Sequence, residues 1–204
     1  MKIDEWLNFF KQHQEKKLFS LSDLVQLTGE KKSSLSVQLT RLVQANVIRR
    51  PVQFWYENPF NIPSPEEIAM VIRYPSYLSM EYALSKQGIL SQVVHTLTLV
   101  TTKLPYVYKN QYVTYEYHQI DKSLFWGYKK EGIVLTAEPE KALLDLVYIR
   151  YSRNKKHSFT AIASLINDMS IESLDLDKIR FYSKKFDFST RRVLSQLGLV
   201  LKKH

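Results

Sequence analysis

The spacing of apolar residues over residues 3–46 predicts three short amphipathic helices. The first is expected over residues 3–13, with one apolar side made by Ile3, Trp6, Leu7 and Phe10. The second begins after Ser22, whose hydroxyl can accept a hydrogen bond from an unpaired N–H of the first helical turn. It ends at Gly29, because glycine readily adopts the left-handed conformation that closes a helix. Packed together, the three helices would enclose one small core.

The third helix is expected to begin at Ser33 or Ser34 and to run to about Asn46. Its buried face is made by Leu35, Leu39, Leu42 and Val43. Residues 47–50 and 53–56 then predict two short strands on either side of Pro51, which suits a turn or a sheet edge. Helix, glycine turn, helix and basic hairpin resemble a winged helix-turn-helix.

A proline-rich connector over residues 58–65 separates this part from the rest, so we expect a winged helix-turn-helix domain over 1–60 and a second domain over 61–204. In the second domain the pattern predicts helices over 65–74, over 79–87 and from Pro139, and strands over 94–101, 106–109, 112–120 and 133–135. Three further helices are expected to begin at Ser158, at Asp175 or Asp177, and after Ser189. The expected fold class is α+β: a mixed α/β domain with a small, mainly antiparallel sheet and a helical C-terminal tail.

The polar face of the third helix carries side chains typical of DNA-binding proteins. Hydroxyls and amides can bond base edges and phosphates, while lysine and arginine neutralise the backbone. The candidate DNA-binding residues are Lys31, Lys32, Ser33, Ser34, Ser36, Gln38, Arg41, Gln44, Arg49 and Arg50. The alternative is a solvated helical hairpin with an ordinary charged face. The two arginines directly after the helix favour double-stranded DNA.

Charge and composition indicate which partners and which cell compartment to expect. The net charge of +9 is uneven: residues 1–60 carry +3, residues 61–148 carry −1 and residues 149–204 carry +7. A polyanion that touches both ends would explain this distribution, although basic tails that only aid solubility remain an alternative for the C-terminal part. The chain has no cysteine, and its N-terminus does not read as a signal peptide. No apolar stretch is long enough to cross a bilayer, so we expect a cytoplasmic protein without a membrane partner.

Catalytic and cofactor motifs are not apparent in the sequence. The five histidines lack metal-binding spacing, and no phosphate-binding or dinucleotide fingerprint is present. Glu138, Glu140 and Asp145 are the most plausible nuclease carboxylates, but acids at the start of a helix are explained by its dipole. We therefore expect no enzymatic activity, no cofactor and no metal.

Five sequence segments, taken in their order along the chain, indicate a protein family and not only a type of fold. They are YLSMEYALSKQGIL (77–90), HTLTLVTTK (95–103), YEYHQI (115–120), LFWGY (124–128) and IVLTAEPEKALLDLVY (133–148). Together with KKSSLSVQLTRLVQANVIRR (31–50), this series resembles the AbiEi antitoxin family of type IV toxin–antitoxin (abortive infection) modules. The resemblance covers about residues 3–150. The motif residues that it highlights are Glu81, Lys103, His118, Glu140, Lys141 and Asp145.

The resemblance implies a bifunctional protein. Its N-terminal domain would bind inverted repeats upstream of its own operon and repress transcription. Its C-terminal domain would counter a nucleotidyltransferase-like toxin, without a stable complex between the two proteins. A ligand-sensing transcriptional regulator with no toxin partner is the alternative that the tyrosine- and tryptophan-rich second domain leaves open.

Overall fold

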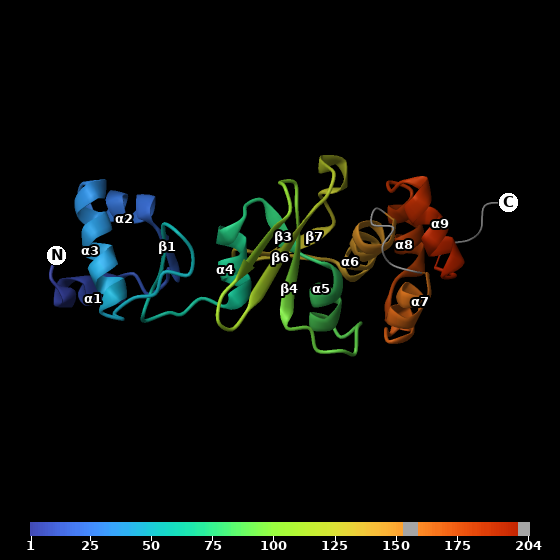
Figure 1. The fold of residues 1–204 in the computed structure, drawn as a ribbon, viewed down its shortest axis with the longest axis horizontal. Helices are drawn as coiled ribbons and strands as arrows, with labels where there is room; N and C mark the ends of the chain where they lie inside the picture. Colours follow the sequence, from blue (N-terminus) through green and yellow to red (C-terminus); the bar gives the residue numbers. More distant parts are fainter. Residues whose placement is uncertain (153–158, 200–204) are drawn as a thin grey trace. The chain divides into compact units, whose positions relative to one another are not determined.

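A computed structural model describes residues 1–152 and 159–199 and divides the chain into two compact units, residues 1–72 and 73–204 (Figure 1). The fold is α+β, as predicted. Residues 1–72 form four helices and a two-stranded sheet. The described part of the second unit combines a six-stranded sheet with further helices. The division falls a few residues after the proline-rich connector, so that the helix following the connector belongs to the first unit.

The first unit is built on the three predicted helices, α1 (Ile3–Gln12), α2 (Leu21–Thr28) and α3 (Lys32–Gln44). Their core consists of Trp6, Phe9, Phe10, Phe19, Leu21, Leu24, Leu35, Leu39, Leu42, Ile48 and Tyr56. The prediction for α1 was wrong in one respect, because Ile3 is about half exposed and Phe9 is buried instead. The aromatic rings of Trp6, Phe9 and Phe10 pack against one another and rotate the buried side of α1 away from Ile3.

The start of α2 differs from the prediction. Ser20, not Ser22, is the N-cap: its hydroxyl accepts a hydrogen bond from the Asp23 N–H, and the Asp23 carboxylate accepts one from the Ser20 N–H. This capping box needs an acidic or amide residue three positions after the serine, which Ser20 has and Ser22 lacks. Gly29 ends α2 in the left-handed conformation, as predicted. Helix α3 begins after Lys31 without a serine cap at Ser33 or Ser34.

The predicted strand over residues 47–50 is wrong. Asn46 adopts a left-handed conformation, and the Val47 N–H donates to the Leu42 carbonyl, so α3 ends in a tight reversal that buries Ile48. The second predicted strand exists as β2 (Trp55–Glu57). Its antiparallel partner is β1 (Leu18–Ser20), the segment between α1 and α2, with Phe19 opposite Tyr56. Helix α4 (Pro65–Ile72) then begins at the predicted proline.

The second unit contains a mixed sheet that is larger than the small, mainly antiparallel one predicted. Its strands are β3 (Ser76–Leu78), β4 (Thr96–Thr101), β5 (Tyr106–Lys109), β6 (Thr114–Gln119), β7 (Tyr128–Glu131) and β8 (Val134–Ala137). Their order is β5-β6-β4-β3-β8-β7, and both the β4–β6 and the β3–β8 pairs are parallel. The short strand β3, which the sequence pattern did not predict, joins β4 to β8 and so unites two hairpins in one sheet.

The helices of the second unit are α5 (Met80–Lys86), α6 (Pro139–Leu146), α7 (Phe159–Asn167), α8 (Leu176–Ser183) and α9 (Phe188–Gln196). Short 3-10 turns lie at Lys122–Leu124 and Ile171–Ser173. Helix α6 continues as a π-helix, η2 (Val147–Ser152). The predicted start at Ser158 lies outside the described residues. The cap of α9 is Asp187, whose carboxylate accepts from the Thr190 N–H, and not Ser189 as predicted.

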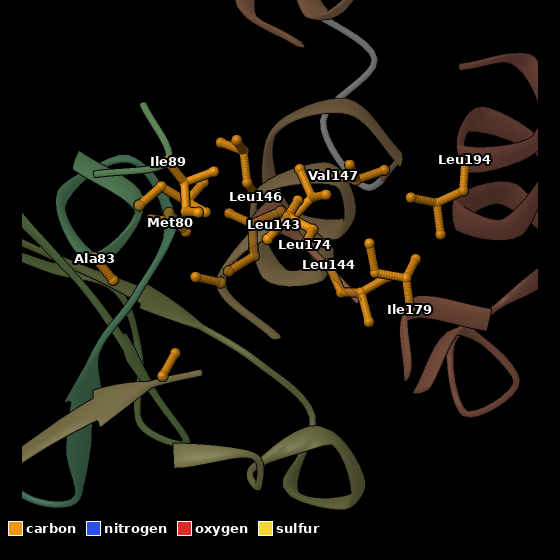
Figure 2. Close-up of a cluster of buried hydrophobic side chains, with 14 of the residues drawn as sticks. Met80, Ala83, Ile89, Leu143, Leu144, Leu146, Val147, Leu174, Ile179 and Leu194 are labelled. Atoms are coloured by element: carbon orange, nitrogen blue, oxygen red, sulfur yellow. The ribbon is translucent and has the colours of Figure 1, made fainter. Parts of the chain in front are cut away.

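Helix α6 is the buried centre of the second unit, as predicted. Leu143, Leu144 and Leu146 project from it into one hydrophobic cluster (Figure 2). Side chains from the other elements meet them there: Met80, Ala83 and Ile89 from α5 and the turn after it, Val147 from η2, Leu174, Ile179 from α8, and Leu194 from α9. A single core therefore joins one face of the sheet to the C-terminal helices.

Candidate nucleic-acid interface

Helix α3 presents a polar surface on the side opposite its leucines. Leu35, Leu39 and Leu42 are buried, which fixes the orientation of the helix against the core. The side chains that face away from those leucines are exposed: Ser33, Val37, Thr40, Arg41 and Gln44. The three-residue connection from Gly29 to Lys31 holds α3 next to α2. An α-helix with its side chains is about as wide as the DNA major groove, so an outward-facing helix of this kind can enter it.

Positive charge surrounds this surface. Residues 31–56 contain five lysines and arginines and no aspartate or glutamate. Lys31 and Lys32 lie at the N-terminus of α3, Arg41 near its C-terminus, and Arg49 and Arg50 just after it; all five are exposed. The stretch carries five positive charges and no negative one between Glu30 and Glu57, and such a local excess of cations attracts a phosphate backbone.

Gln38, a predicted base-reading residue, is engaged within the unit. Its Oε1 accepts from the N-terminal amine at 2.7 Å and from the Trp6 indole N–H at 3.1 Å. Its Nε2 donates to the Ser34 hydroxyl at 3.0 Å and to the Glu30 carboxylate. All four hydrogen-bonding positions of the amide are thus used. Gln38 and Ser34 lie at the edge of the surface, and any base contact by them would first require this network to break.

Ser36 also lies beside the centre of the surface. It is half-buried, and its hydroxyl donates to the Lys32 carbonyl at 2.9 Å. The predicted residues that the structure gathers on the outer face are therefore Ser33, Arg41 and Gln44, with the cations on either side. Thr40, which the prediction omitted, lies between them, and its hydroxyl donates to the Ser36 carbonyl. Its spacing, seven residues after Ser33 and four before Gln44, places it on the same face of the helix and would have identified it.

Five of the six motif residues of the second unit gather in three polar networks, around α6 and around the π-helix that continues it. In the first, Lys141 and Asp145 form an ion pair one helical turn apart, and both side chains are completely buried. Asp145 also accepts hydrogen bonds from the Tyr77 hydroxyl at 2.9 Å and the Ser79 hydroxyl at 2.8 Å. Lys141 donates to the Tyr77 hydroxyl at 2.8 Å. Neither Tyr77 nor Ser79 was predicted to belong to this network, because both come from a distant part of the chain.

Aromatic rings complete the surroundings of Lys141. Its ammonium group lies 5.3 Å from the Tyr77 ring centroid, 5.1 Å from that of Trp126 and 5.5 Å from that of Phe186. Gly127 closes the remaining side, where an added Cβ would lie 2.8 Å from Cγ of the lysine. Burial lowers the pKa of Lys141 and raises that of Asp145, because both charges have lost their hydration. This network holds β3 and α6 together and is closed to outside partners.

The second network joins α6 to α8. Lys178 forms ion pairs of 3.0 Å with both Glu138 and Glu140, and the Tyr182 hydroxyl donates to Glu138 at 3.0 Å. Burial of Lys178 lowers its pKa, but the hydrogen bonds to the two glutamates outweigh this effect and raise the pKa overall. Two of the three carboxylates suggested by a nuclease hypothesis thus share one lysine as ion-pair partner, and the third is Asp145 in the buried pair.

The third network lies at the π-helix. The Arg150 guanidinium donates to Glu81 at 2.8 Å and lies 3.6 Å from Glu116 of β6. His118 Nε2 lies 3.4 Å from the same Glu116 carboxylate. These four side chains are only partly exposed, so α5, β6 and η2 meet in one half-buried charged cluster. Lys103 lies apart from all three networks, exposed in the loop after β4.

The third network makes stability depend on pH through His118. Burial and the neighbouring Arg150 lower the pKa of His118 below its ordinary value, against the opposing effect of Glu116 and Glu81. The folded chain therefore binds a proton less readily than the unfolded chain, and stability falls as the pH drops below about 6.5. His118→Gln is expected to flatten this decline in thermal melts between about pH 8 and about pH 5.

The matched control for this prediction is His95→Gln, which removes an exposed imidazole from the same unit. It should leave the pH dependence of the melting temperature as in the parent chain. An unchanged pH profile for His118→Gln would contradict the assignment.

Neither a family model nor a curated protein matches this chain. Within residues 1–152 and 159–199, no cluster of three or more histidine, aspartate or glutamate side chains is placed to hold a metal ion. Over the same described ranges, no helix combines the length and apolar character needed to cross a membrane.

Proposed function

We propose that the first unit binds double-stranded DNA through the outer face of α3, and that the chain is the antitoxin and repressor of a type IV toxin–antitoxin module in the cytoplasm. The observation that carries the DNA-binding half is the acid-free stretch 31–56, whose five cations surround an exposed helix face. Hydroxyl, amide and guanidinium groups there suit base edges and phosphates together.

The order of elements in the first unit supports a winged helix-turn-helix. A strand lies between the first and second helices, and it pairs with the strand that follows the third helix. The Glu57 N–H donates to the Arg49 carbonyl at 2.9 Å, so the segment after α3 also runs beside β2. The connection between them is a tight turn at Gln53 and Phe54. This wing is short, so we expect α3 to make most of the DNA contacts.

The antitoxin half of the proposal derives from the resemblance of residues 77–148 to AbiEi proteins. Its proposed functional partner is a nucleotidyltransferase-like toxin with which it forms no stable complex. Engagement of Glu138, Glu140 and Asp145 by lysines supports a role without catalysis, because those carboxylates are held as structural ion pairs. The proposal needs neither a metal nor a cofactor.

Two measurements test the halves separately. Gel retention with duplex DNA from upstream of the gene should show binding at low salt, which weakens for Arg41→Ala in proportion to one lost phosphate contact. Co-expression with the toxin encoded by the adjacent gene should restore growth. Failure to bind the duplex would refute the repressor half, and failure to restore growth would refute the antitoxin half. A ligand-induced thermal shift, with no toxin gene adjacent, would instead favour the metabolite-sensing regulator.

A further inference from the structure

Two phenylalanines on the C-terminal helices point away from the core. Phe181 of α8 and Phe188 at the start of α9 are 61% and 73% exposed. The same helices bury Ile179 and Leu194 in the central cluster (Figure 2), so their packing does not require either phenylalanine. Phe181 and Phe188 lie seven residues apart on consecutive helices, and two rings this exposed are available to contact a ligand.

Cations accompany these rings. Lys184 and Lys185 follow α8, and Arg192 lies one turn after Phe188; all three side chains are exposed, and none forms an ion pair within the described part of the chain. The nearby acids are already engaged. Asp187 caps α9 through the Thr190 N–H at 2.8 Å, and Asp177 pairs with Arg180 at 2.8 Å. Residues 181–192 hold four lysines and arginines against one acid, Asp187, so this segment carries a net positive charge. We call Phe181, Lys184, Lys185, Phe188 and Arg192, which are all exposed, the α8–α9 surface.

Further aromatic rings continue this surface toward the sheet. The Lys185 ammonium lies 4.2 Å from the Trp126 ring centroid, and the Trp126 and Tyr182 rings meet edge to face at 4.7 Å. Phe181 lies 6.1 Å from Tyr182. Residues 181–188 thus combine two exposed phenylalanines with two exposed lysines, and proteins use such a combination to stack unpaired bases while neutralising the backbone.

We propose that the α8–α9 surface binds single-stranded nucleic acid, with Phe181 and Phe188 stacking on bases and Lys184, Lys185 and Arg192 contacting phosphates. A duplex would satisfy the cations but offers no base faces to the rings, because its bases are stacked on one another. A membrane surface would need a broad apolar helix face. Of the other apolar side chains of α8 and α9, Ile179 and Leu194 are buried in the core and Tyr182 and Val193 pack against it, which leaves Leu176, 38% exposed, beside the two phenylalanines. This activity is separate from the duplex binding proposed for α3.

The test is fluorescence anisotropy of the full chain with a labelled single-stranded oligonucleotide of about 15 nucleotides, as RNA and as DNA, at low salt. The parent chain should bind, and Phe181→Ala with Phe188→Ala should raise the Kd roughly 30-fold or more, as expected for two lost base stacks. Phe181→Trp with Phe188→Trp should retain binding. Lys184→Gln with Lys185→Gln should reduce the slope of log K against log salt by about 1.4.

Three controls distinguish this surface from others. Tyr112→Ala removes an aromatic ring that is 87% exposed elsewhere in the second unit, and it should not change the Kd. The double phenylalanine variant should bind duplex DNA like the parent chain. Arg41→Ala with Gln44→Ala should weaken duplex binding and leave single-strand binding intact, so the two activities fail independently.

Several results would overturn the proposal. One is the absence of single-strand binding by the parent chain, and another is an unchanged Kd in the double alanine variant. Binding to anionic lipid vesicles that depends on the two phenylalanines, without single-strand binding, would assign the surface to a membrane. A dimer that dissociates in the double alanine variant, again without single-strand binding, would assign it to self-association.

Discussion

Asp145→Asn is expected to destabilise the second unit by roughly 3–5 kcal/mol, the typical result of removing one partner from a buried ion pair. The substitution leaves the Lys141 ammonium charged in a site with no access to water. The Tyr77 and Ser79 hydroxyls also lose the charged acceptor to which both donate. A neutral amide can accept some of these hydrogen bonds but cannot balance the lysine.

Hydrogen exchange measured on peptides from β3 and α6 reports this loss for the second unit alone, which matters because the two units need not unfold together. Adding Lys141→Met should recover part of the lost stability, since it removes the uncompensated charge. Asp177→Asn is the matched control, because Asp177 is 90% exposed in its ion pair with Arg180 and should change protection little. Equal effects of Asp145→Asn and Asp177→Asn would contradict the role assigned to the buried pair.

Replacing Lys31, Lys32, Arg49 and Arg50 together by glutamine is expected to reduce the slope of log K against log salt for duplex binding by about three to four. Each cation that contacts a phosphate releases roughly 0.9 of a counterion, so four lost contacts account for this reduction. Anisotropy titrations of a labelled upstream duplex over a series of salt concentrations measure the slope directly.

A second four-fold variant separates local contacts from total charge. Lys103, Lys109, Lys129 and Lys130 are exposed lysines of the second unit, and replacing them by glutamine changes the net charge by the same amount. This variant should keep the parent slope. If both variants lowered the slope equally, net charge alone would drive binding and the α3 surface would have no special part in it.

Local sequence patterns were sufficient to predict the helices. The 3.6-residue period of the leucines in α3 predicted its buried face, and its bounds to within about two residues, and Gly29 predicted the end of α2. The cap of α2 was missed although it is also local, since the Ser20–Asp23 capping box is visible in the sequence. Attention to the third residue after each serine would have identified it.

The sheet could not be predicted in the same way, because strand pairing joins distant segments. The three residues of β3 carry too little alternation to be recognised, yet their neighbours β4 and β8 lie about 20 and 60 residues further along the chain. The same reason explains the error in the wing: nothing within residues 47–57 indicates that the partner of β2 is β1.

Some features of the candidate sites could likewise be predicted from local spacing, and others depend on contacts between distant segments. The exposed face of α3 follows from helical spacing alone. The engagement of Gln38 does not, because its partners Trp6 and the N-terminal amine come from the start of the chain. The four-residue spacing of Lys141 and Asp145 suggests an ion pair. Its complete burial depends on Tyr77, Ser79 and Gly127, which tertiary structure alone brings together.

Protection of a single introduced cysteine tests the central claim, that duplex DNA covers the outer face of α3, most directly. The chain has no cysteine, so Gln44→Cys and Asn8→Cys each provide one reactive thiol, on the exposed sides of α3 and α1 respectively. With saturating upstream duplex, maleimide labelling should slow strongly at position 44 and proceed unchanged at position 8. Undiminished labelling at position 44 while the duplex is bound would show that DNA lies elsewhere on the protein.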